Sequence, residues 1–501
     1  MMTIYPEAAQ FKTLYESGQA QLVWQWMSSD LETPVSAYLK VCGHAPNSFL
    51  LESVEGGATL GRYSVIGTRP DFLWRCTKGV VETCDGKTAY WKPYEEDNAL
   101  DSLRKAIQNS SIETLPDGLP PMCTLGLFGY IGYDMIRHIE AIPDQNPDDL
   151  DLPDSLLMRP SIMIIFDNVK QQICIATPVY TDNTRSADEA YMKAKQRLTQ
   201  ITDTLSKPLD QNLLTHKTTL SPDQKPVSNT AEPHYKESVN KAIEYIYAGD
   251  IFQVVLSQRF TMAYDLPPFE LYRALRSLNP SPFLFYLSFD GFSLVGSSPE
   301  ILVRVRDDIV TIRPIAGTRK RGETIQEDQR LEAELLADPK ERSEHLMLVD
   351  LGRNDVGRVA KIGTVEVTEQ FQIERYSHVM HIVSNVNGEL REDIDPLDAF
   401  FAGFPAGTVS GAPKIRAMEI IDELEVGRRG TYAGGIGRFS SKSIDSCIAL
   451  RTALVKDGKI HVQAGGGVVA DSVPELEHQE CQNKAKAVLK AAERTIKKFQ
   501  S

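Results

Sequence analysis

Several features are missing from this sequence of 501 residues, and each absence excludes a class of protein. No apolar run approaches the roughly 18 residues that a membrane-spanning helix requires, and the N-terminal stretch MMTIYPEAAQF has neither region of a signal peptide. The seven cysteines are scattered without CxxC spacing, which argues against a disulfide framework and a structural zinc site. We therefore expect a cytoplasmic protein with no membrane partner.

Positive charge is also scarce. The chain has 54 Lys and Arg against 68 Asp and Glu, which gives a formal net charge of −14 at pH 7. A general electrostatic attraction to nucleic acid is therefore not expected, and an anionic ligand needs a local cationic pocket. The glycines at 126, 129 and 132 do not have the GxGxxG spacing of a dinucleotide site, and FPAGTVSGAPK (404–414) does not have the Walker spacing.

Two-residue turns between strand-like runs are the main fold signal. Asp290-Gly291, Asp307-Asp308 and Asp457-Gly458 each join two such runs, and turns this short pair strands antiparallel. We therefore predict an α+β fold with large antiparallel sheets rather than a doubly wound parallel sheet.

A change in composition divides the chain. Residues 206–233 are polar and contain four prolines, which is typical of a linker, although an insertion within one domain has the same composition. We place an N-terminal portion at 1–205 and a C-terminal portion at 234–501.

The last predicted hairpin gives a geometry for Arg451. The expected cross-strand pairs are Val455 with Ile460, Ala453 with Val462 and Arg451 with Ala464. Small neighbours leave space above the guanidinium, and the following glycines, 465–467, let backbone N–H groups approach a ligand. An anion site is predicted here, and a surface arginine that extends into solvent is the alternative.

A helix is predicted to follow these glycines. Ser472 is the expected capping hydroxyl, Pro474 lies in the first turn, and Glu477, Glu480 and Lys484 fall on one face. Two carboxylates and an amine beside a glycine-rich turn fit a metal and anion site. A solvated face with an i,i+4 ion pair fits equally well.

A second acidic helix is predicted at ADPKERSEHLMLVD. Asp338 is a good N-cap, Pro339 fits the first turn, and Glu341 and Glu344 share a face. Facing Glu477 and Glu480, these carboxylates could supply hard oxygen ligands for Mg²⁺. An exposed, well-capped helix start is the alternative.

Eight strings occur in one order across residues 251–486. They are IFQVVLSQR, NPSPFLFYL, GSSPEILVRV, RPIAGTRKRG, SEHLMLVDLGRND, FPAGTVSGAPK, RRGTYAGGIG and QAGGGVVADSVPELEHQECQNKA. Together they resemble the chorismate-binding enzymes, and most closely the anthranilate synthase component I family. LLES (50–53) resembles the tryptophan-binding element of that family, so the likeness covers most of the chain outside 206–233.

The resemblance implies a fold, a reaction and partners. The fold would have its antiparallel sheets packed as a sandwich with surrounding helices, residues 1–205 being regulatory and 234–501 catalytic. The reaction would convert chorismate and ammonia to anthranilate and pyruvate with Mg²⁺, as the first step of tryptophan biosynthesis. No nucleophilic-cysteine motif of a glutaminase is present, so ammonia from glutamine would need a partner amidotransferase subunit in a hetero-oligomer.

The resemblance also implies roles for individual residues. Glu344 and Glu480 would hold Mg²⁺, supported by Glu341 and Glu477. Carboxylate-positioning residues would be Tyr432, Arg451, Gly465, Gly466, Gly467 and Lys484, and the ring pocket would contain Gly317 and Thr318. Glu300 would be the general acid for the departing C4 hydroxyl, which requires a buried carboxyl with a raised pKa. The catalytic set would be completed by His381, Thr408 and Gln253, although a strand histidine such as His381 is more often a core residue.

Two positions distinguish branches of this family. Relatives that add water at C2 carry Lys at the position of Gln253, and relatives that form a covalent amine carry Lys at Ala316. Gln253 cannot activate water as a base and Ala316 cannot form an adduct, so both positions favour anthranilate formation. The alternatives are an aminodeoxychorismate synthase component and a non-catalytic, tryptophan-binding regulatory subunit.

Feedback inhibition by tryptophan is the last implication. Glu52 and Ser53 would meet the ammonium and carboxylate ends of the amino acid, with Pro282, Phe283 and Leu284 nearby. Phe283 and Leu284 stand where the family often has Tyr-Met, so the strength of inhibition is not implied.

Overall fold

The computed structural model describes residues 3–500, apart from 56–58, 87, 89, 95–97, 113–114, 182–183 and 377–378. The described α-helices are α1 (Ala8–Glu16), α2 (Pro34–Val41), α3 (Ala99–Gln108), α4 (Ala187–Leu205), α5 (Glu232–Ala248), α6 (Pro268–Leu278), α7 (Ile325–Ala337), α8 (Pro339–Gly357), α9 (Pro396–Ala402), α10 (Lys414–Leu424) and α11 (Pro474–Phe499). Short 3₁₀ turns are η1 (Pro121–Thr124), η2 (Tyr133–His138), η3 (Gln211–Leu214) and η4 (Gly407–Val409). Within this described part, no helix combines the length and apolar composition that a membrane crossing requires.

Antiparallel strands form two layers. In hydrogen-bonded order, the first layer contains β1 (Ile4–Tyr5), β2 (Gln21–Ser28), β11 (Gln172–Val179), β10 (Ser155–Asp167), β6 (Tyr63–Thr77), β3 (Ser48–Glu52), β14 (Phe283–Ser288), β15 (Phe292–Ser298), β24 (Thr452–Lys456), β25 (Lys459–Val468) and β13 (Gln253–Ala263). The short strands β12 (Val227–Ser228) and β21 (Gly411–Ala412) pair with β13.

The second layer starts from β10 as well. It contains, in order, β9 (Leu127–Ile131), β22 (Gly435–Phe439), β23 (Ile444–Ile448), β16 (Ile301–Arg306), β17 (Ile309–Ile312) and β20 (Val379–Glu389), which also pairs with β18 (Ile315–Lys320) and β19 (Glu366–Arg375). The remaining strands are β7 (Val80–Cys84) and β8 (Lys92–Pro93) beside β6, and the separate ribbon β4 (Val54–Glu55) with β5 (Thr59–Leu60). Because β10 pairs in both layers, the two layers belong to one hydrogen-bonded sheet of 23 strands.

Period-2 alternation explains how the layers pack. In β14, Phe285 and Leu287 point into a core between the layers, whereas Leu284 and Tyr286 point outward. Rings from the two layers meet in this inner core, where Phe49 stacks on Phe128 with centroids 4.6 Å apart. The predicted α+β fold with a sandwich of antiparallel sheets is therefore confirmed.

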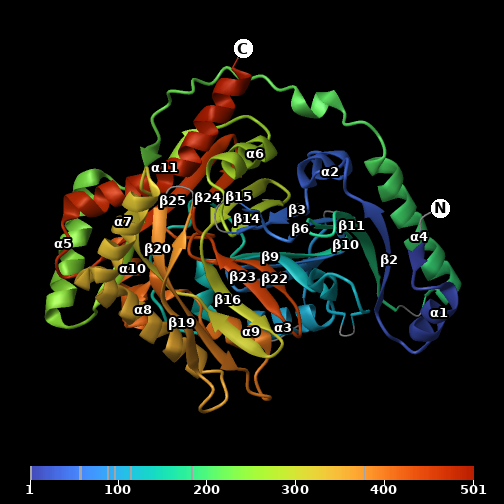
Figure 1. The fold of residues 1–501 in the computed structure, drawn as a ribbon, viewed down its shortest axis with the longest axis horizontal. Helices are drawn as coiled ribbons and strands as arrows, with labels where there is room; N and C mark the ends of the chain where they lie inside the picture. The colour runs from blue at the N-terminus through green and yellow to red at the C-terminus, as the bar shows by residue number, and fades with distance from the viewer. Residues whose placement is uncertain are drawn as a thin grey trace.

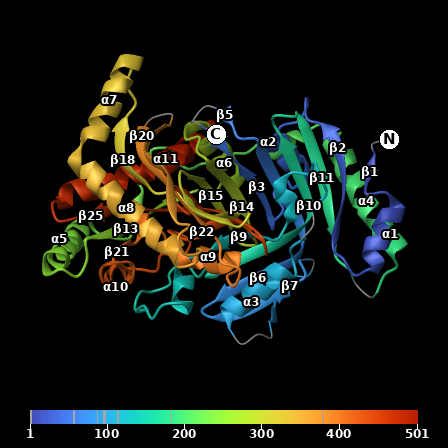
Figure 2. The same cartoon turned by 60° about the horizontal axis from the view of Figure 1, so that its bottom comes forward.

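Helices cover both outer faces. Helices α5, α6 and α11 pack on the first layer beside β13 and β15, and α8 and α9 pack on the second layer. Figure 1 shows α5, α8 and α11 toward the left of the molecule, α6 and α9 nearer its middle, and α1 and α4 at the right end. Figure 2 shows α3 against β6 and β7.

The chain between α4 and β12 arches over the top of the molecule (Figure 1). Near its middle, the N–H of Thr218 donates to the carbonyl of Phe499, so the arch is attached to the end of α11. The boundaries at 205 and 234 stay a prediction. Strands from both predicted portions share the sheet, because β3 pairs with β14 and β9 pairs with β22.

The three predicted two-residue hairpin turns are confirmed. Phe289 and Phe292 are joined by a backbone hydrogen bond around Asp290-Gly291, Arg306 pairs with Ile309, and Lys456 pairs with Lys459. Asp457 and Gly458 both have positive φ, as a twisted hairpin turn requires.

One part of the last hairpin was predicted wrongly. Ala453 pairs with Val462 as expected, but the strand does not continue back through Arg451, which has a φ of 49°. Residues 449–451 leave the second layer at β23 and enter the first layer at β24, and Ala464 pairs instead with Gln258 of β13. The prediction failed because the alternation of apolar and polar side chains looks the same in a continuous strand and in a chain that passes from one layer to the other.

The two predicted helix starts differ in outcome. Asp338 caps α8 as expected, accepting hydrogen bonds from the N–H groups of Lys340 and Glu341. The N-cap of α11 is Val473 rather than Ser472. The Ser472 hydroxyl instead donates to Oε1 of Glu477 at 2.7 Å, because that carboxylate lies one turn into the helix.

Candidate active site

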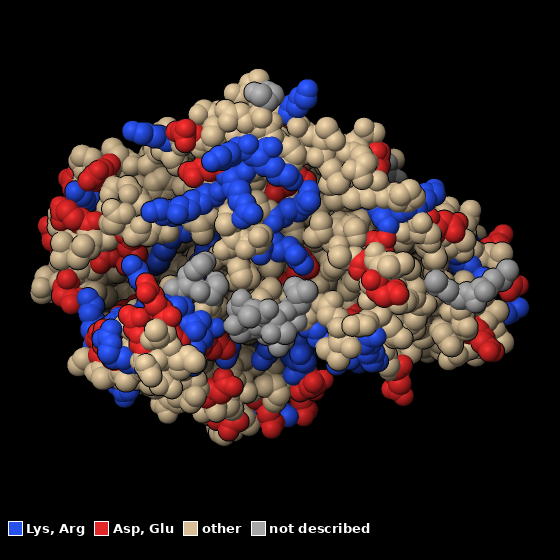
Figure 3. Space-filling view, turned by 45° about the horizontal axis from the view of Figure 1, so that its top comes forward, with Lys and Arg blue, Asp and Glu red and all other residues tan. Residues whose placement is uncertain are grey.

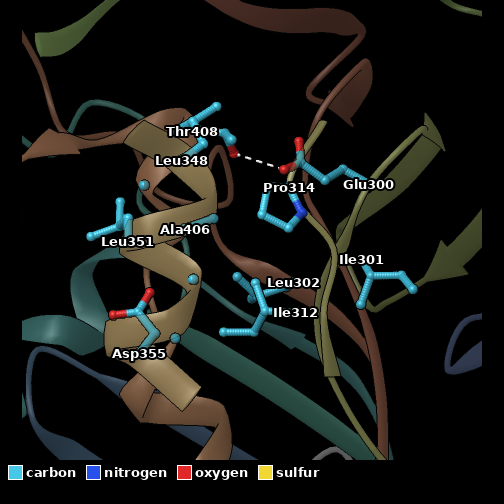
Figure 4. A pocket seen from close by; sticks show the side chains of 13 residues that line it. Glu300, Ile301, Leu302, Ile312, Pro314, Leu348, Leu351, Asp355, Ala406 and Thr408 are labelled. Atoms are coloured by element: carbon cyan, nitrogen blue, oxygen red, sulfur yellow. Dashed lines mark hydrogen bonds between the residues drawn. The ribbon is translucent and has the colours of Figure 1, made fainter. Parts of the chain in front are cut away.

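Glu300 is a buried carboxyl between β15 and β16. Its Oε1 accepts a hydrogen bond from the Thr408 hydroxyl of η4 at 3.0 Å. Figure 4 shows the two side chains at one end of a pocket of about 330 Å³, a volume that includes the solvent at its mouth, between α8 and strands β16 and β17. Burial raises the pKa of Glu300 to about 8, and Thr408, a backbone N–H and the cations Lys484 and Arg451 offset part of that rise. At neutral pH the carboxyl is therefore mostly protonated, as a general acid must be.

Arg451 lies close to this carboxyl. Arg451 is half-buried as a whole residue, and within the described ranges its side chain has no ion-pair partner. Burial lowers its pKa, while Tyr376 and Glu300 act in the opposite direction. Because a desolvated guanidinium without a counter-ion is costly, the position favours an anionic ligand.

The triple glycine of β25 is approached closely by side chains from three elements. A Cβ on Gly465 would lie 3.0 Å from the Tyr432 hydroxyl, one on Gly466 would lie 3.1 Å from Glu477, and one on Gly467 would lie 2.5 Å from the Gln253 amide. Larger residues would therefore clash or displace these groups.

Lys484 of α11 faces the same strand. Its Nζ donates to the carbonyl of Gly465 at 3.0 Å and lies 2.7 Å from Oε1 of Glu480. The ammonium is held between the glycine strand and the acidic face of α11, where it can meet a carboxylate.

His381 of β20 pairs across the strands with Thr318 of β18. Nδ1 of His381 is 2.9 Å from the carbonyl of Gly317 and 3.1 Å from the Thr318 hydroxyl. A carbonyl only accepts, so Nδ1 carries the proton and Nε2 is left as an acceptor. Burial, with smaller contributions from Arg451 and Lys484, lowers the pKa of His381 to about 4, so the ring is neutral at pH 7.

The predicted carboxylates come from two helices that face each other. Burial raises the pKa of Glu344 of α8, and both Glu341 and Glu480 add to that rise. Burial likewise raises the pKa of Glu477, and Glu480 again contributes. Glu341 is already paired with Arg319 at 2.9 Å. Negative charge therefore accumulates between α8 and α11 around Glu344, Glu477 and Glu480.

This donor set fits Mg²⁺ better than a metal that needs a complete protein cage. Among the residues the structure describes, no three His, Cys, Asp or Glu side chains converge closely enough to form a cage on their own. Mg²⁺ is usually bound through one or two carboxylates, with substrate oxygens and waters completing the shell. Glu344 and Glu480 are suited to that arrangement.

Surface charge is not uniform around this region. The outer face of α11 carries the exposed cations Lys486, Lys490, Arg494 and Lys497. Figure 3 shows Lys and Arg gathered near the centre of the face it presents, with Asp and Glu spread toward its rim. An acidic protein thus has a locally positive face.

The residues predicted to bind tryptophan lie together at the junction of β3 and β14. Glu52 pairs in register with Leu284. The Glu52 carboxylate is buried and accepts hydrogen bonds from the Tyr272 hydroxyl at 2.5 Å and from Nε of Arg276 at 2.6 Å. Ser53 follows directly, and Pro282 and Phe283 precede Leu284 on the neighbouring strand.

Sequence reasoning missed two groups beside the site. Tyr376 packs its ring against His381, with centroids 5.5 Å apart, and Arg429 forms a buried ion pair with Glu425. Arg429 follows another arginine, Arg428, whose side chain pairs at the surface with Asp144. The doublet itself does not indicate which arginine is buried.

Comparison with known proteins agrees with this geometry. The model of the chorismate binding enzyme family matches residues 63–490. Anthranilate synthase component 1 of Cereibacter sphaeroides is 53% identical over 489 residues, which cover 96% of each chain, and that of Acetivibrio thermocellus is 46% identical over 98% of each. The crystal structure of anthranilate synthase component I from Streptococcus pneumoniae superposes with a TM-score of 0.75 and 36% identity over 92% of this chain and 99% of that one. The chain therefore belongs to the chorismate-binding enzyme family, on the branch of the component 1 relatives of anthranilate synthase.

Proposed function

We propose that this chain is the large subunit of an anthranilate synthase, which converts chorismate and ammonia to anthranilate, pyruvate and water. The observation that carries the proposal is the buried carboxyl of Glu300, with a pKa of about 8, beside Thr408 and Arg451, which has no ion-pair partner among the described residues. A proton donor next to the cations Arg451 and Lys484 suits a dicarboxylate that loses a hydroxyl group. The identity to component 1 relatives along nearly the whole chain supports the same reaction.

The residues take the following parts in this reaction. Arg451 and Lys484 bind the substrate carboxylates, and the glycines at 465–467 let the ligand lie against the backbone of β25. Glu300 donates its proton to the C4 hydroxyl, which leaves as water while ammonia forms the new C–N bond at C2. Loss of the C2 proton and of the enolpyruvyl group as pyruvate then gives the aromatic ring. His381 is neutral and presents Nε2 as an acceptor near the ring.

Glu344 and Glu480 would hold Mg²⁺, with Glu477 and Glu341 in support. When bound, the ion supplies a positive charge that withdraws electron density from the substrate through its ring carboxylate. The raised pKa of Glu344, to which Glu341 and Glu480 contribute, supports this assignment because a divalent cation would relieve their mutual repulsion.

The amide side chain of Gln253 is consistent with ammonia, rather than water, as the nucleophile. Its amide lies against Gly467, is almost fully buried, and has no basic group that could deprotonate water. The Oε1 of this amide has no hydrogen-bond partner within the described part of the chain, so it is available to accept from an N–H donor. We propose that a glutamine amidotransferase subunit supplies the ammonia.

An assay with chorismate, Mg²⁺ and ammonium tests this function. Anthranilate, recognised by its fluorescence, and an equal amount of pyruvate are the expected products. Accumulation of aminodeoxychorismate without anthranilate would instead support the other amine-forming branch. No turnover of chorismate, together with intact tryptophan binding, would support a regulatory subunit.

Tryptophan inhibition is proposed to act through Glu52. The Glu52→Gln variant should raise the tryptophan concentration for half-inhibition at least tenfold, because it removes the charge proposed to meet the ammonium group and weakens the buried contacts of Glu52 with Tyr272 and Arg276. The measurement is the inhibition curve at fixed chorismate, with thermal unfolding as the check on folding. Glu82→Gln, a change in a surface ion pair on β7, is the matched control. An unaltered inhibition curve for Glu52→Gln would exclude this assignment.

A further inference from the structure

A buried ion pair lies directly behind the candidate active site. Arg429 is 3% exposed, and Glu425, which follows α10, is 9% exposed. Nε of Arg429 lies 3.0 Å from Oε2 of Glu425, and Nη2 lies 2.5 Å from Oε1. Burying two charges is costly unless further hydrogen bonds compensate, so the other hydrogen bonds of this pair show which segments it fixes in place.

Those contacts reach η4, β13 and the rings of two tyrosines. Nη1 of Arg429 donates to the carbonyl of Val409 at 2.7 Å, and Nη2 donates to the carbonyl of Val255 at 2.7 Å. Oε1 of Glu425 accepts from both the N–H and the hydroxyl of Ser257 at 2.8 Å. The guanidinium also lies over the ring of Tyr432, 5.4 Å from its centroid, and over that of Tyr133 at 4.9 Å.

Three of these groups lie at the site: Val409 of η4, strand β13 and Tyr432. Val409 directly follows Thr408, whose hydroxyl donates to Glu300. Val255 and Ser257 of β13 pair with Gly467 and Gly465 of β25, so they fix the strand against which the substrate would lie. The Tyr432 hydroxyl also lies close to Gly465, since a Cβ added there would be 3.0 Å from it.

We propose that Arg429, held in place by Glu425, is a positioning residue that sets Thr408 against Glu300 and aligns the glycine strand with the acid. This inference rests on the proposed function, because it assigns to Arg429 the placement of the proton donor of that reaction. Arg429 touches no substrate; it acts through the carbonyls of Val409 and Val255. A planar guanidinium can donate in these directions at once, whereas the single ammonium of lysine cannot reach all four acceptor oxygens.

The pH profile distinguishes this role from simple support of the fold. The hydrogen bond from Thr408 lowers the pKa of Glu300. If Thr408 moves away, that pKa rises, and the alkaline decline of kcat shifts to higher pH. A general loss of stability would lower the amount of folded enzyme without moving this limb.

The experiment measures kcat and KM for chorismate against pH in Arg429→Lys, at constant free ammonia and saturating Mg²⁺. We expect kcat at pH 7 to fall about 10- to 100-fold, because small displacements of a catalytic group are costly. The alkaline decline of kcat should shift to higher pH. Thr408→Val should move the limb in the same direction. Adding Arg429→Lys to Thr408→Val should cause no further shift.

Arg416→Lys is the matched control, because Arg416 forms its ion pairs with Asp250 and Glu419 at the surface of α10. If Arg429→Lys does not fold, the double variant Glu425→Leu with Arg429→Met removes both buried charges and gives the same readout. An alkaline limb that stays at the wild-type pH in a folded Arg429 variant, or a shift that persists in the Thr408→Val background, would overturn the inference. Failure of the wild-type enzyme to form anthranilate would instead contradict the proposed function.

Discussion

Replacing Glu300 by Gln should lower anthranilate formation by roughly 10²- to 10⁴-fold, the usual contribution of a general acid. The amide keeps the size of the side chain and can still accept from Thr408, so the substrate pocket stays intact. Its proton cannot be transferred to the departing hydroxyl. The measurement is kcat with ammonium as nitrogen source, and we expect a smaller change in KM for chorismate than in kcat.

The pH dependence of kcat in the wild-type enzyme should report the ionisation of Glu300. The acid must be protonated, so kcat should decline as pH rises through about 8, the pKa of Glu300. The free ammonia concentration has to be held constant, because it changes with pH. Glu237→Gln, on the exposed face of α5, is the matched control and should keep both the rate and the profile. A Glu300→Gln enzyme with the wild-type rate would remove the acid assignment.

The pH dependence of the unfolding free energy gives a second measure of the pKa of Glu300. Its folded-state pKa of about 8 lies above the ordinary value of 4.5, so the folded protein retains a proton that the unfolded chain has lost. This contribution to stability is fully present below pH 4.5 and is lost as pH rises to about 8. Glu300→Gln has no such loss, and its unfolding free energy relative to wild type should grow by roughly a few kcal/mol over this range.

Replacing Glu480 by Gln is expected to have the second largest effect. We expect at least a 100-fold loss of turnover at physiological Mg²⁺ and a clear rise in the Mg²⁺ concentration required, because one of the two proposed carboxylate ligands is removed. The fold should be retained, since the ion pair of Glu480 with Lys484 is a half-exposed i,i+4 pair worth roughly 0.3–0.5 kcal/mol. The measurement is the Mg²⁺ dependence of kcat/KM, with thermal unfolding as a check.

Glu493→Gln provides the control on the same helix, two turns or more from the proposed metal ligands and without a role in the site. It should reproduce the wild-type Mg²⁺ dependence. If Glu480→Gln also reproduced it, the ligand would have to be sought elsewhere on the facing helices. A loss of turnover in both variants would point to a disturbance of α11 rather than to a lost ligand.

Local chemistry made part of the fold predictable. The turns at Asp290-Gly291, Asp307-Asp308 and Asp457-Gly458 require residues that tolerate positive φ, so their hairpins could be read from the sequence. The cap at Asp338 is equally local. The change of layer at 449–451 could not be read, because side-chain alternation does not record which layer a strand joins.

Prediction of the site from the sequence was limited in the same way. Glycines 465–467 and the acidic face of α11 were visible as patterns, and the resemblance supplied Glu300 and Thr408. Glu425 and Arg429 have the spacing of an ordinary surface ion pair, and only the packing of β13, η4 and Tyr432 around them makes the pair buried. Burial of this kind depends on segments far apart in the chain.

The pairing of β3 with β14 has a consequence for synthesis of the chain. Glu52 finds its strand partner only when Leu284 has been made. At about 5–20 residues per second, the edge of β3 emerges from the ribosome roughly ten to fifty seconds before the strand that covers it. During that interval the unpaired backbone groups at this edge can pair with other chains, so the nascent N-terminal sheet benefits from chaperone protection.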